Sequence, residues 1–137
     1  MKDEEIENNL IVKLTFEFSK MILQYCEILN ERKKFILSNQ LLRSGTSIGA
    51  NIWEAQNAES KPDFVHKFKI AAKEMEETKY WLLLCEFYQD CPKPNELIDK
   101  LNPIQKIITK IISTSKKSLK KKPPPSNTTP LTNQLIS

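Results

Sequence analysis

The stretch Gly45-Thr46-Ser47-Ile48-Gly49 has the letters of a hydrolase nucleophile elbow, G-x-S-x-G, and contains the only two glycines of the chain. In such an elbow a strand runs into a strained turn that exposes the serine hydroxyl near a histidine. Here the preceding residues are NQLLRS, which is no β-branched strand, and the only histidine is His66. A short motif without its structural setting is usually a chance match. We therefore reject Ser47 as a nucleophile and predict a packing role for the glycines.

The other residue types that could do chemistry lack the partners that such chemistry needs. No set of ligands with the spacing of a zinc site accompanies His66. Glu74 and Glu77 belong to a polar helix face without a pocket-forming loop that would raise a carboxylate pKa, which argues against general acid–base catalysis. The sequence therefore predicts a protein that is not an enzyme and that uses no cofactor, metal ion or small-molecule substrate.

The length of 137 residues predicts one domain with a single core. No apolar run approaches the ~18–20 residues that span a bilayer, so we expect no membrane segment. The N-terminus, MKDEEIENN, lacks the features of an export signal. The three cysteines are odd in number and widely spaced, which favours buried, reduced thiols over a disulfide framework, with a catalytic thiol as the weaker alternative. We expect a cytoplasmic protein.

Apolar periodicity and the near absence of glycine predict an all-α domain over residues 1–118. Four helices are expected, at about 5–29, 38–58, 61–88 and 96–118. The third begins at the capping box Ser60-Lys61-Pro62-Asp63. In the fourth we expect a kink or a fresh start near Asn102, because Pro103 interrupts the pattern. Residues 119–137 lose the periodicity and are rich in lysine and proline, which predicts a disordered basic tail.

Each expected helix carries an apolar stripe that predicts its buried face. The first stripe includes Leu10 and Phe18, and the second includes Trp53 together with both glycines. Gly45 and Gly49 lie one turn apart, where two absent side chains let another backbone approach. Glycine costs about 1 kcal/mol relative to alanine in a helix, so two glycines on one face need a contact that offsets this cost. We predict that this contact is a close helix crossing. The alternative is that the helix tolerates both glycines without a crossing. The stripe of the third expected helix consists of Phe64, Phe68, Ala71, Met75, Thr78, Leu82 and Cys85. The stripe of the fourth consists of Leu97, Leu101, Ile104, Ile108 and Ile111.

Two features bear on contacts between subunits. A polar row on the other side of the second helix follows helical spacing and is either a solvated face or an interface in an assembly; it consists of Arg43, Ser47, Asn51 and Glu54. The segment 80–88, YWLLLCEFY, is apolar or aromatic at eight of nine positions, so we expect it to be buried all round, by a second subunit. The candidate oligomer-interface residues are Arg43, Ser47, Asn51, Tyr80, Trp81 and Leu84.

The charge of the chain is distributed unevenly along its length. Eight of its 21 basic residues are lysines between Lys100 and the end, where no acid occurs, which leaves 13 basic against 17 acidic residues in positions 1–99. Such a basic block attracts phosphates, although a merely solubilising tail explains it equally well. No aromatic residue is interleaved for base stacking. The candidate nucleic-acid contacts are Lys106, Lys110, Lys116, Lys117, Lys120, Lys121 and Lys122.

The residues QLLRSGTSIGANIWEAQNAESKPDF and KIAAKEMEETKYWLLL resemble the four-helix bundle proteins encoded in intervening sequences of bacterial 23S ribosomal RNA genes. The resemblance is strongest over 40–84 and departs from the family at Trp53 and Pro103. It implies an antiparallel up-down bundle without catalytic residues. A related accessory protein of diversity-generating retroelements forms a five-fold ring that binds nucleic acid and a reverse transcriptase. The resemblance therefore implies a homo-oligomer, with a pentamer as the size that this relative suggests.

Two functions remain in contention on the basis of the sequence. The first is a non-enzymatic, self-associating bundle that binds RNA, DNA or a nucleic-acid-processing enzyme through its basic C-terminal part. The second is a scaffold that binds only proteins, with a tail that aids solubility. An enzyme is the third and weakest class, because a pocket with perturbed catalytic groups cannot be assembled from these residue types.

Overall fold

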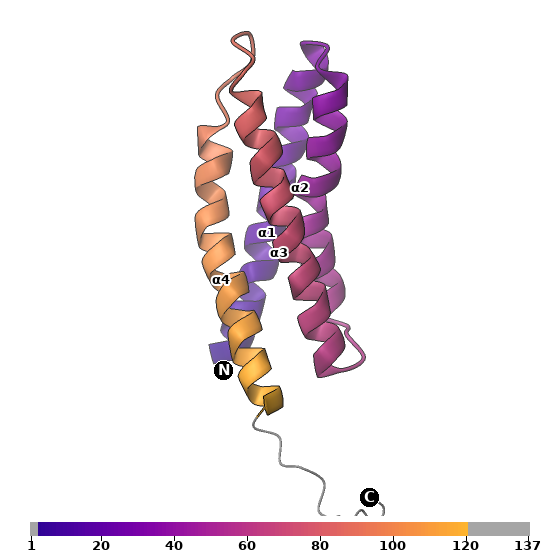
Figure 1. Ribbon diagram of the computed structural model, residues 1–137, viewed down its shortest axis with the longest axis vertical. Helices are drawn as coiled ribbons and strands as arrows, with labels where there is room; N and C mark the ends of the chain where they lie inside the picture. The colour runs from indigo at the N-terminus through magenta and orange to yellow at the C-terminus, as the bar shows by residue number, and fades with distance from the viewer. Residues whose placement is uncertain (1–2, 121–137) are drawn as a thin grey trace, which may run out of the picture.

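The computed structural model describes residues 3–120, which form four helices (Figure 1). These are α1 (Asp3–Glu31), α2 (Phe35–Ala55), α3 (Lys61–Cys85) and α4 (Asn95–Lys120). The prediction of an all-α fold is confirmed, and every expected helix is present. The predicted tail from residue 121 onward, with Lys121 and Lys122, lies outside the described residues.

The helices form a bundle in which each one contacts the next in the chain. α1 packs against α2, α2 against α3 and α3 against α4, and α1 also contacts α4. Figure 1 shows the connections at alternating ends of the bundle. They are short, at 32–34, 56–60 and 86–94, and short connections favour antiparallel packing of neighbouring helices. None of the described helices is long and apolar enough to cross a bilayer.

The core lies along the middle of the bundle, where the predicted stripes of α3 and α4 meet. All members of both stripes are buried except Phe64, which is partly buried and stacks on Phe68 with ring centroids 4.7 Å apart. Heptad-like spacing keeps these side chains on one face for about six turns of α3 and about four turns of α4, so the core side of both helices could be predicted from the sequence.

On α1 the buried face is rotated from the predicted one. Phe18 is fully buried, but Leu10 is exposed, and its neighbour Ile11 takes the core position together with Thr15 and Ile22. The rotation turns α1 toward α2, whose glycines allow a close approach. On α2 the prediction for Trp53 is wrong as well, because its indole is exposed on the outer side of the α1–α2 seam.

The ends of α3 follow the sequence only in part. The hydroxyl of Ser60 accepts a hydrogen bond from the Asp63 N–H at 3.2 Å, as expected for an N-cap. The Asp63 carboxylate accepts from the N–H of Glu59, at 3.3 Å, and thus from the residue before the cap. The helix ends at Cys85, so residues 86–88 belong to the connection rather than to α3.

The fourth helix runs without a break from Asn95 through Pro103 to Lys120. Of the two alternatives expected near Asn102, a kink or a fresh start, the fresh start is therefore wrong. Pro103 is exposed, whereas Leu101 and Ile104 on either side of it are buried. Burial of these neighbours holds the helical path across the proline, and tertiary packing thereby outweighs the local cost of the ring.

Candidate interaction surfaces

The two glycines lie where α2 crosses α1. A Cβ atom at Gly45 would lie 2.8 Å from Cγ1 of Ile22, and one at Gly49 would lie 3.1 Å from the carbonyl oxygen of Thr15. Distances of this size leave no room for a methyl group unless the neighbour moves. A nucleophile elbow needs a tight turn between a strand and a helix. Residues 45–49 instead lie inside the continuous helix α2, so the structure does not provide the setting that a nucleophilic Ser47 would need.

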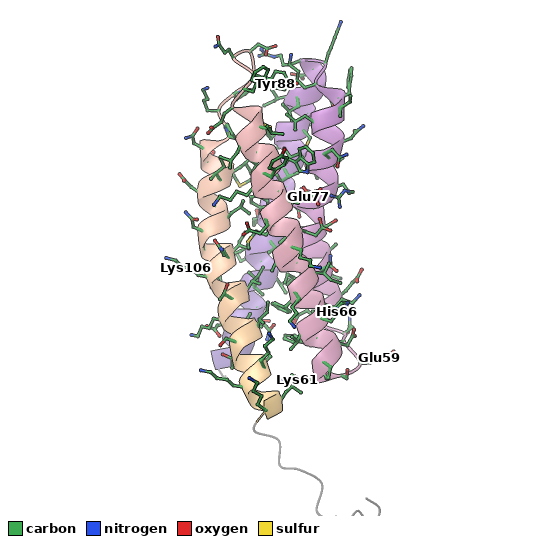
Figure 2. All side chains as sticks on the ribbon, viewed as in Figure 1. Glu59, Lys61, His66, Glu77, Tyr88 and Lys106 are labelled. Atoms are coloured by element: carbon green, nitrogen blue, oxygen red, sulfur yellow. The ribbon has the colours of Figure 1, made fainter. Side chains whose placement is uncertain are left out.

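The polar row of α2 lies along the seam with α3. Arg43 forms an ion pair with Glu74 at 3.2 Å and a second one with Glu77, which Figure 2 shows on the side of α3 that faces α2. The indole N–H of Trp81 also donates to Glu77, at 3.0 Å. Together the Trp81 hydrogen bond and the Arg43 guanidinium lower the pKa of the Glu77 carboxyl.

The other residues of the polar row, Ser47, Asn51 and Glu54, also form hydrogen bonds or ion pairs within the chain. The Ser47 hydroxyl donates to the carbonyl of Arg43 at 2.6 Å, and the Asn51 amide donates to the carbonyl of Ser47 at 2.8 Å. Glu54 pairs with Lys67 of α3 at 2.9 Å. In one chain these side chains bond to their own helix or bridge to α3, while Arg43 and Glu54 remain exposed to solvent. An interface of this row with a second subunit stays a prediction. Sequence spacing alone could not reveal the pairs across helices.

The C-terminal end of α3 carries apolar side chains that the chain itself does not cover. Tyr80, Leu83, Leu84 and Phe87 are all large and exposed, and we call them the α3 cluster. Trp81 is partly buried and meets Tyr80 edge to face, with ring centroids 5.1 Å apart. The expectation of burial all round is thus not met within one chain. Such exposed patches mark interaction sites in many proteins.

A second apolar surface, which the sequence patterns did not predict, lies on the outer side of the α1–α2 seam. It is a groove of about 390 Å³, and we call it the α1–α2 groove. Its lining includes Val12, Phe16, Thr46, Gly49, Ala50 and Trp53. Leu23, two turns beyond Phe16, is exposed as well. The spacing of four and seven between Val12, Phe16 and Leu23 was a signal for this second stripe, because it widens the apolar arc of α1 beyond what one core requires.

The predicted nucleic-acid contacts within the described residues lie on α4. All five lysines are exposed, and Figure 2 shows Lys106 pointing away from the bundle. Lys106, Lys110 and Lys117 line one shallow groove together with Gln105, Thr109 and Ser113. At 3.6 residues per turn, Lys106, Lys110, Lys117 and Lys120 fall within about 80° of arc. Lys110 also forms an ion pair with Glu7 of α1 at 2.7 Å.

Burial raises the pKa of several thiols and of one tyrosine hydroxyl in the bundle. Cys26, Cys85 and Cys91 are free and buried, and burial raises the pKa of each thiol, to about 11 for Cys85. Tyr25 donates to the carbonyl of Pro92 at 2.7 Å, and burial raises its pKa too. Within the described part of the chain, no group of three or more His, Cys, Asp or Glu side chains could hold a metal ion.

Comparison with known proteins gives a family and a fold. The model of a family described as 23S rRNA-intervening sequence protein matches residues 7–110. The chain is also similar to a crystal structure from Bacteroides thetaiotaomicron VPI-5482, of a protein with unknown function from the S23 ribosomal protein family. The two are 39% identical with a TM-score of 0.73, and the match covers 78% of this chain and 98% of that chain. Among curated proteins, no sequence matches this chain. Neither description names a catalytic activity.

Proposed function

Because the chain belongs to the 23S rRNA-intervening sequence protein family, we propose that it is a non-enzymatic, self-associating bundle of the cytoplasm that binds RNA or DNA, alone or with a nucleic-acid-processing enzyme. The resemblance noted for residues 40–84 is confirmed by this membership. The single observation that carries the proposal is the row of lysines on α4, which gathers four positive charges on one side of the bundle.

The geometry of the row suits phosphate binding. Lys106, Lys117 and Lys120 are exposed. Lys117 follows Lys106 after about three turns of α4, and Lys120 follows Lys117 after about one turn. A helix of this length presents its lysines along a line of more than 20 Å, which matches several phosphates of a nucleic-acid backbone. Lysines in the last turn of a helix also stabilise that helix by their interaction with its dipole. The experiment must therefore show that these lysines bind nucleic acid and do not only stabilise α4.

Self-association is supported by the two uncovered apolar surfaces. A monomeric protein rarely keeps apolar patches of several large side chains in water. The α3 cluster and the α1–α2 groove are such patches, and they lie on different sides of the bundle, because α3 contacts α2 and α4 while the groove lies outside α1 and α2.

The nucleic-acid half is tested by binding measurements as a function of salt. We expect the triple variant Lys106→Gln/Lys117→Gln/Lys120→Gln to bind a duplex more weakly than the wild type. Each lost phosphate contact lowers the slope of log K against log salt by roughly 0.9 on duplex DNA, so the slope should fall by about 2–3. Lys110 is not replaced, because its replacement would also remove the ion pair with Glu7 of α1, and a loss of binding could then not be assigned to phosphate contacts alone.

The matched control carries the same charge change on α3. Lys69, Lys73 and Lys79 are exposed there, and replacing all three by glutamine should leave the salt slope close to that of the wild type. Equal weakening in both variants would mean that overall charge, rather than the α4 row, attracts the nucleic acid.

The exposed α3 cluster also favours the second function, a scaffold that binds only proteins. Gel shifts at physiological salt, with RNA and with DNA, separate the two. A wild-type protein that shifts neither at micromolar concentration would leave the protein scaffold as the function, and the lysines as solubilising groups.

A further inference from the structure

A pocket of about 300 Å³ lies at the end of the bundle where the connection between α2 and α3 meets the N-terminal part of α1 and the C-terminal part of α4. Its lining includes Glu7 of α1, Phe64 of α3 and Ser115 of α4, and Figure 2 shows Lys61 at this end of the molecule. We propose that this pocket, which we call the end pocket, binds an unpaired nucleobase of a single strand whose phosphates lie along the lysines of α4. This inference rests on the proposed nucleic-acid binding and specifies which kind of nucleic acid is bound.

The end pocket combines an aromatic ring with hydrogen-bonding groups. Phe64 is partly buried and stacks on Phe68. The side-chain amide of Gln56 donates to the carbonyl of Ile52 at 3.0 Å, which fixes the amide and leaves its oxygen as an acceptor. Proteins that recognise unpaired bases stack them on aromatic rings and bond their edges. A volume of about 300 Å³ is at the small end of the range for ligand pockets, as suits one base.

The hydroxyl of Ser115 is the observation that points to a ligand. Ser115 is 3% exposed and lines the end pocket. Among the residues that the structure describes, no group forms a hydrogen bond with this hydroxyl. Serine and threonine hydroxyls inside helices often donate to the carbonyl four residues back, as Thr15, Ser19 and Thr46 do here. Because a buried hydroxyl without a partner is costly, a polar edge of a ligand in the pocket would supply the partner that Ser115 lacks.

The end pocket adjoins the groove that the lysines of α4 line. Thr114 lines both, and Lys110 of the groove pairs with Glu7 of the pocket at 2.7 Å. Lys110 and Lys117 lie on either side of Thr114, at about 6 and 4.5 Å along the helix axis. A strand whose phosphates contact these lysines therefore has a base beside the pocket. No aromatic residue is interleaved with the lysines in the sequence, and the fold supplies one, Phe64, from α3.

The groups in the end pocket also select the state of the strand and the type of base. Bases inside a duplex are paired and stacked, so only an unpaired base can enter a pocket between helices. The Glu7 carboxylate pairs with Lys110 through Oε2, which leaves Oε1 to accept a further hydrogen bond. The N4 amino group of cytosine donates to carboxylates, whereas thymine presents an oxygen at that position. We therefore expect cytosine to bind more tightly than thymine.

The test measures fluorescence anisotropy of labelled single strands of about eight nucleotides, at one fixed salt concentration. Oligo(dC) should bind the wild type at least about tenfold more tightly than oligo(dT), as one hydrogen bond to a charged group provides. The two strands carry the same number of phosphates, so contacts with the lysines alone predict equal affinity.

Two substitutions in the end pocket separate base binding from phosphate binding. Phe64→Leu keeps an apolar side chain against Phe68 but removes the ring, and should weaken oligo(dC) binding about 5–150-fold, as the loss of one base stack does. Ser115→Ala removes a hydroxyl that bonds nothing in the described chain, and should weaken it about 2–10-fold without lowering the melting temperature. Both variants should bind duplex as the wild type does. The matched control is Phe35→Leu, at an exposed ring at the other end of α2, which should leave all affinities unchanged.

The outcomes separate this inference from the function on which it rests. A wild type that binds neither single strands nor duplex would overturn both. Equal affinity for oligo(dC) and oligo(dT), or oligo(dC) binding that Ser115→Ala leaves unchanged, would overturn only the base pocket. Deoxycytidine monophosphate that binds as tightly as the strand would make a free nucleotide the ligand and overturn the link to the lysines. Circular dichroism should report the same helix content in all variants, and Ser115→Ala decides the test if Phe64→Leu does not fold.

Discussion

The side chain of Ile22 on α1 occupies the space beside Gly45 on α2. A Cβ atom at position 45 would lie 2.8 Å from Cγ1 of Ile22 and 3.0 Å from its Cδ1 and Cγ2. Two of these atoms are bonded directly to the Cβ of a β-branched residue, which has one strongly preferred rotamer in a helix. Since Ile22 is fully buried, it cannot turn away, and the two helices cross at the distance that a glycine allows.

Gly45→Ala is therefore expected to destabilise the protein. Overpacking costs about 1–3 kcal/mol, and the better helix propensity of alanine returns about 1 kcal/mol. Because the opposing group is rigid, we expect a net loss of about 1–2 kcal/mol in the free energy of unfolding, measured by chemical denaturation.

A double-mutant cycle identifies the cause of that loss. Ile22→Ala removes all three atoms that the new methyl group would meet, so Gly45→Ala should cost less in its presence, with a coupling of at least ~0.5 kcal/mol. Gly49→Ala should be milder than Gly45→Ala, because its closest contacts are 3.1 and 3.2 Å. Strict additivity of the two substitutions at 22 and 45 would contradict a steric origin of the loss.

Glu77 should make the stability depend on pH. The Trp81 hydrogen bond and Arg43 lower its pKa in the folded protein, so its stabilising effect is present above the unfolded-state pKa, about 4.3, and is lost as the pH falls through the folded-state pKa. Glu77→Gln should lower the melting temperature at pH 7, and the difference from the wild type should shrink below about pH 4.

The control for this prediction is the neighbouring exposed residue Glu76. Glu76→Gln makes the same charge change without touching Arg43 or Trp81, so it should shift the melting temperature less at pH 7. If the difference in melting temperature between Glu77→Gln and the wild type stayed constant down to pH 3, the charge of the Glu77 carboxylate would not contribute to the stability of the contact between α2 and α3.

The cysteines should react slowly in the folded protein. The thiolate is the reactive form, and burial raises the pKa of Cys85 from 9.0 to about 11. Two pKa units reduce the thiolate fraction about 100-fold at pH 8, and burial limits access further. Iodoacetamide should label fewer than one thiol per chain in the time in which all three react in denaturant, as counted by mass spectrometry. Rapid labelling of Cys85 in native protein would reveal local opening at the C-terminal end of α3.

Pro103→Ala should stabilise the protein. The proline lies well inside α4, lacks the N–H that would bond the Asp99 carbonyl and is exposed. Proline is about 3 kcal/mol less favourable than alanine in a helix interior, and its stiffness in the unfolded chain offsets part of this. We expect a gain of about 1–3 kcal/mol in the free energy of unfolding. Asn102→Ala, at the exposed neighbour, should gain no more than about 0.7 kcal/mol, and an equal gain at both sites would contradict a specific cost of the ring.

Local patterns determined much of this fold. The spacing of apolar residues identified the buried faces of α3 and α4, and Ser60 and Asp63 marked where α3 begins. The two glycines indicated a close approach before any partner was known. These signals depend on residues within one or two turns of each other, so the chain carries them without reference to other helices.

The tertiary structure decided what depends on a neighbour. On α1 and α2 the apolar arc is wider than one core contact, and only the approach of the other helices decided that Ile11 is buried while Leu10 and Trp53 face outward. The pairing of Arg43 with Glu77, and of Glu54 with Lys67, joins residues far apart in sequence, which no spacing within one helix can encode. The α1–α2 groove arose in the same way, because a hollow between two helices exists only once their crossing is set.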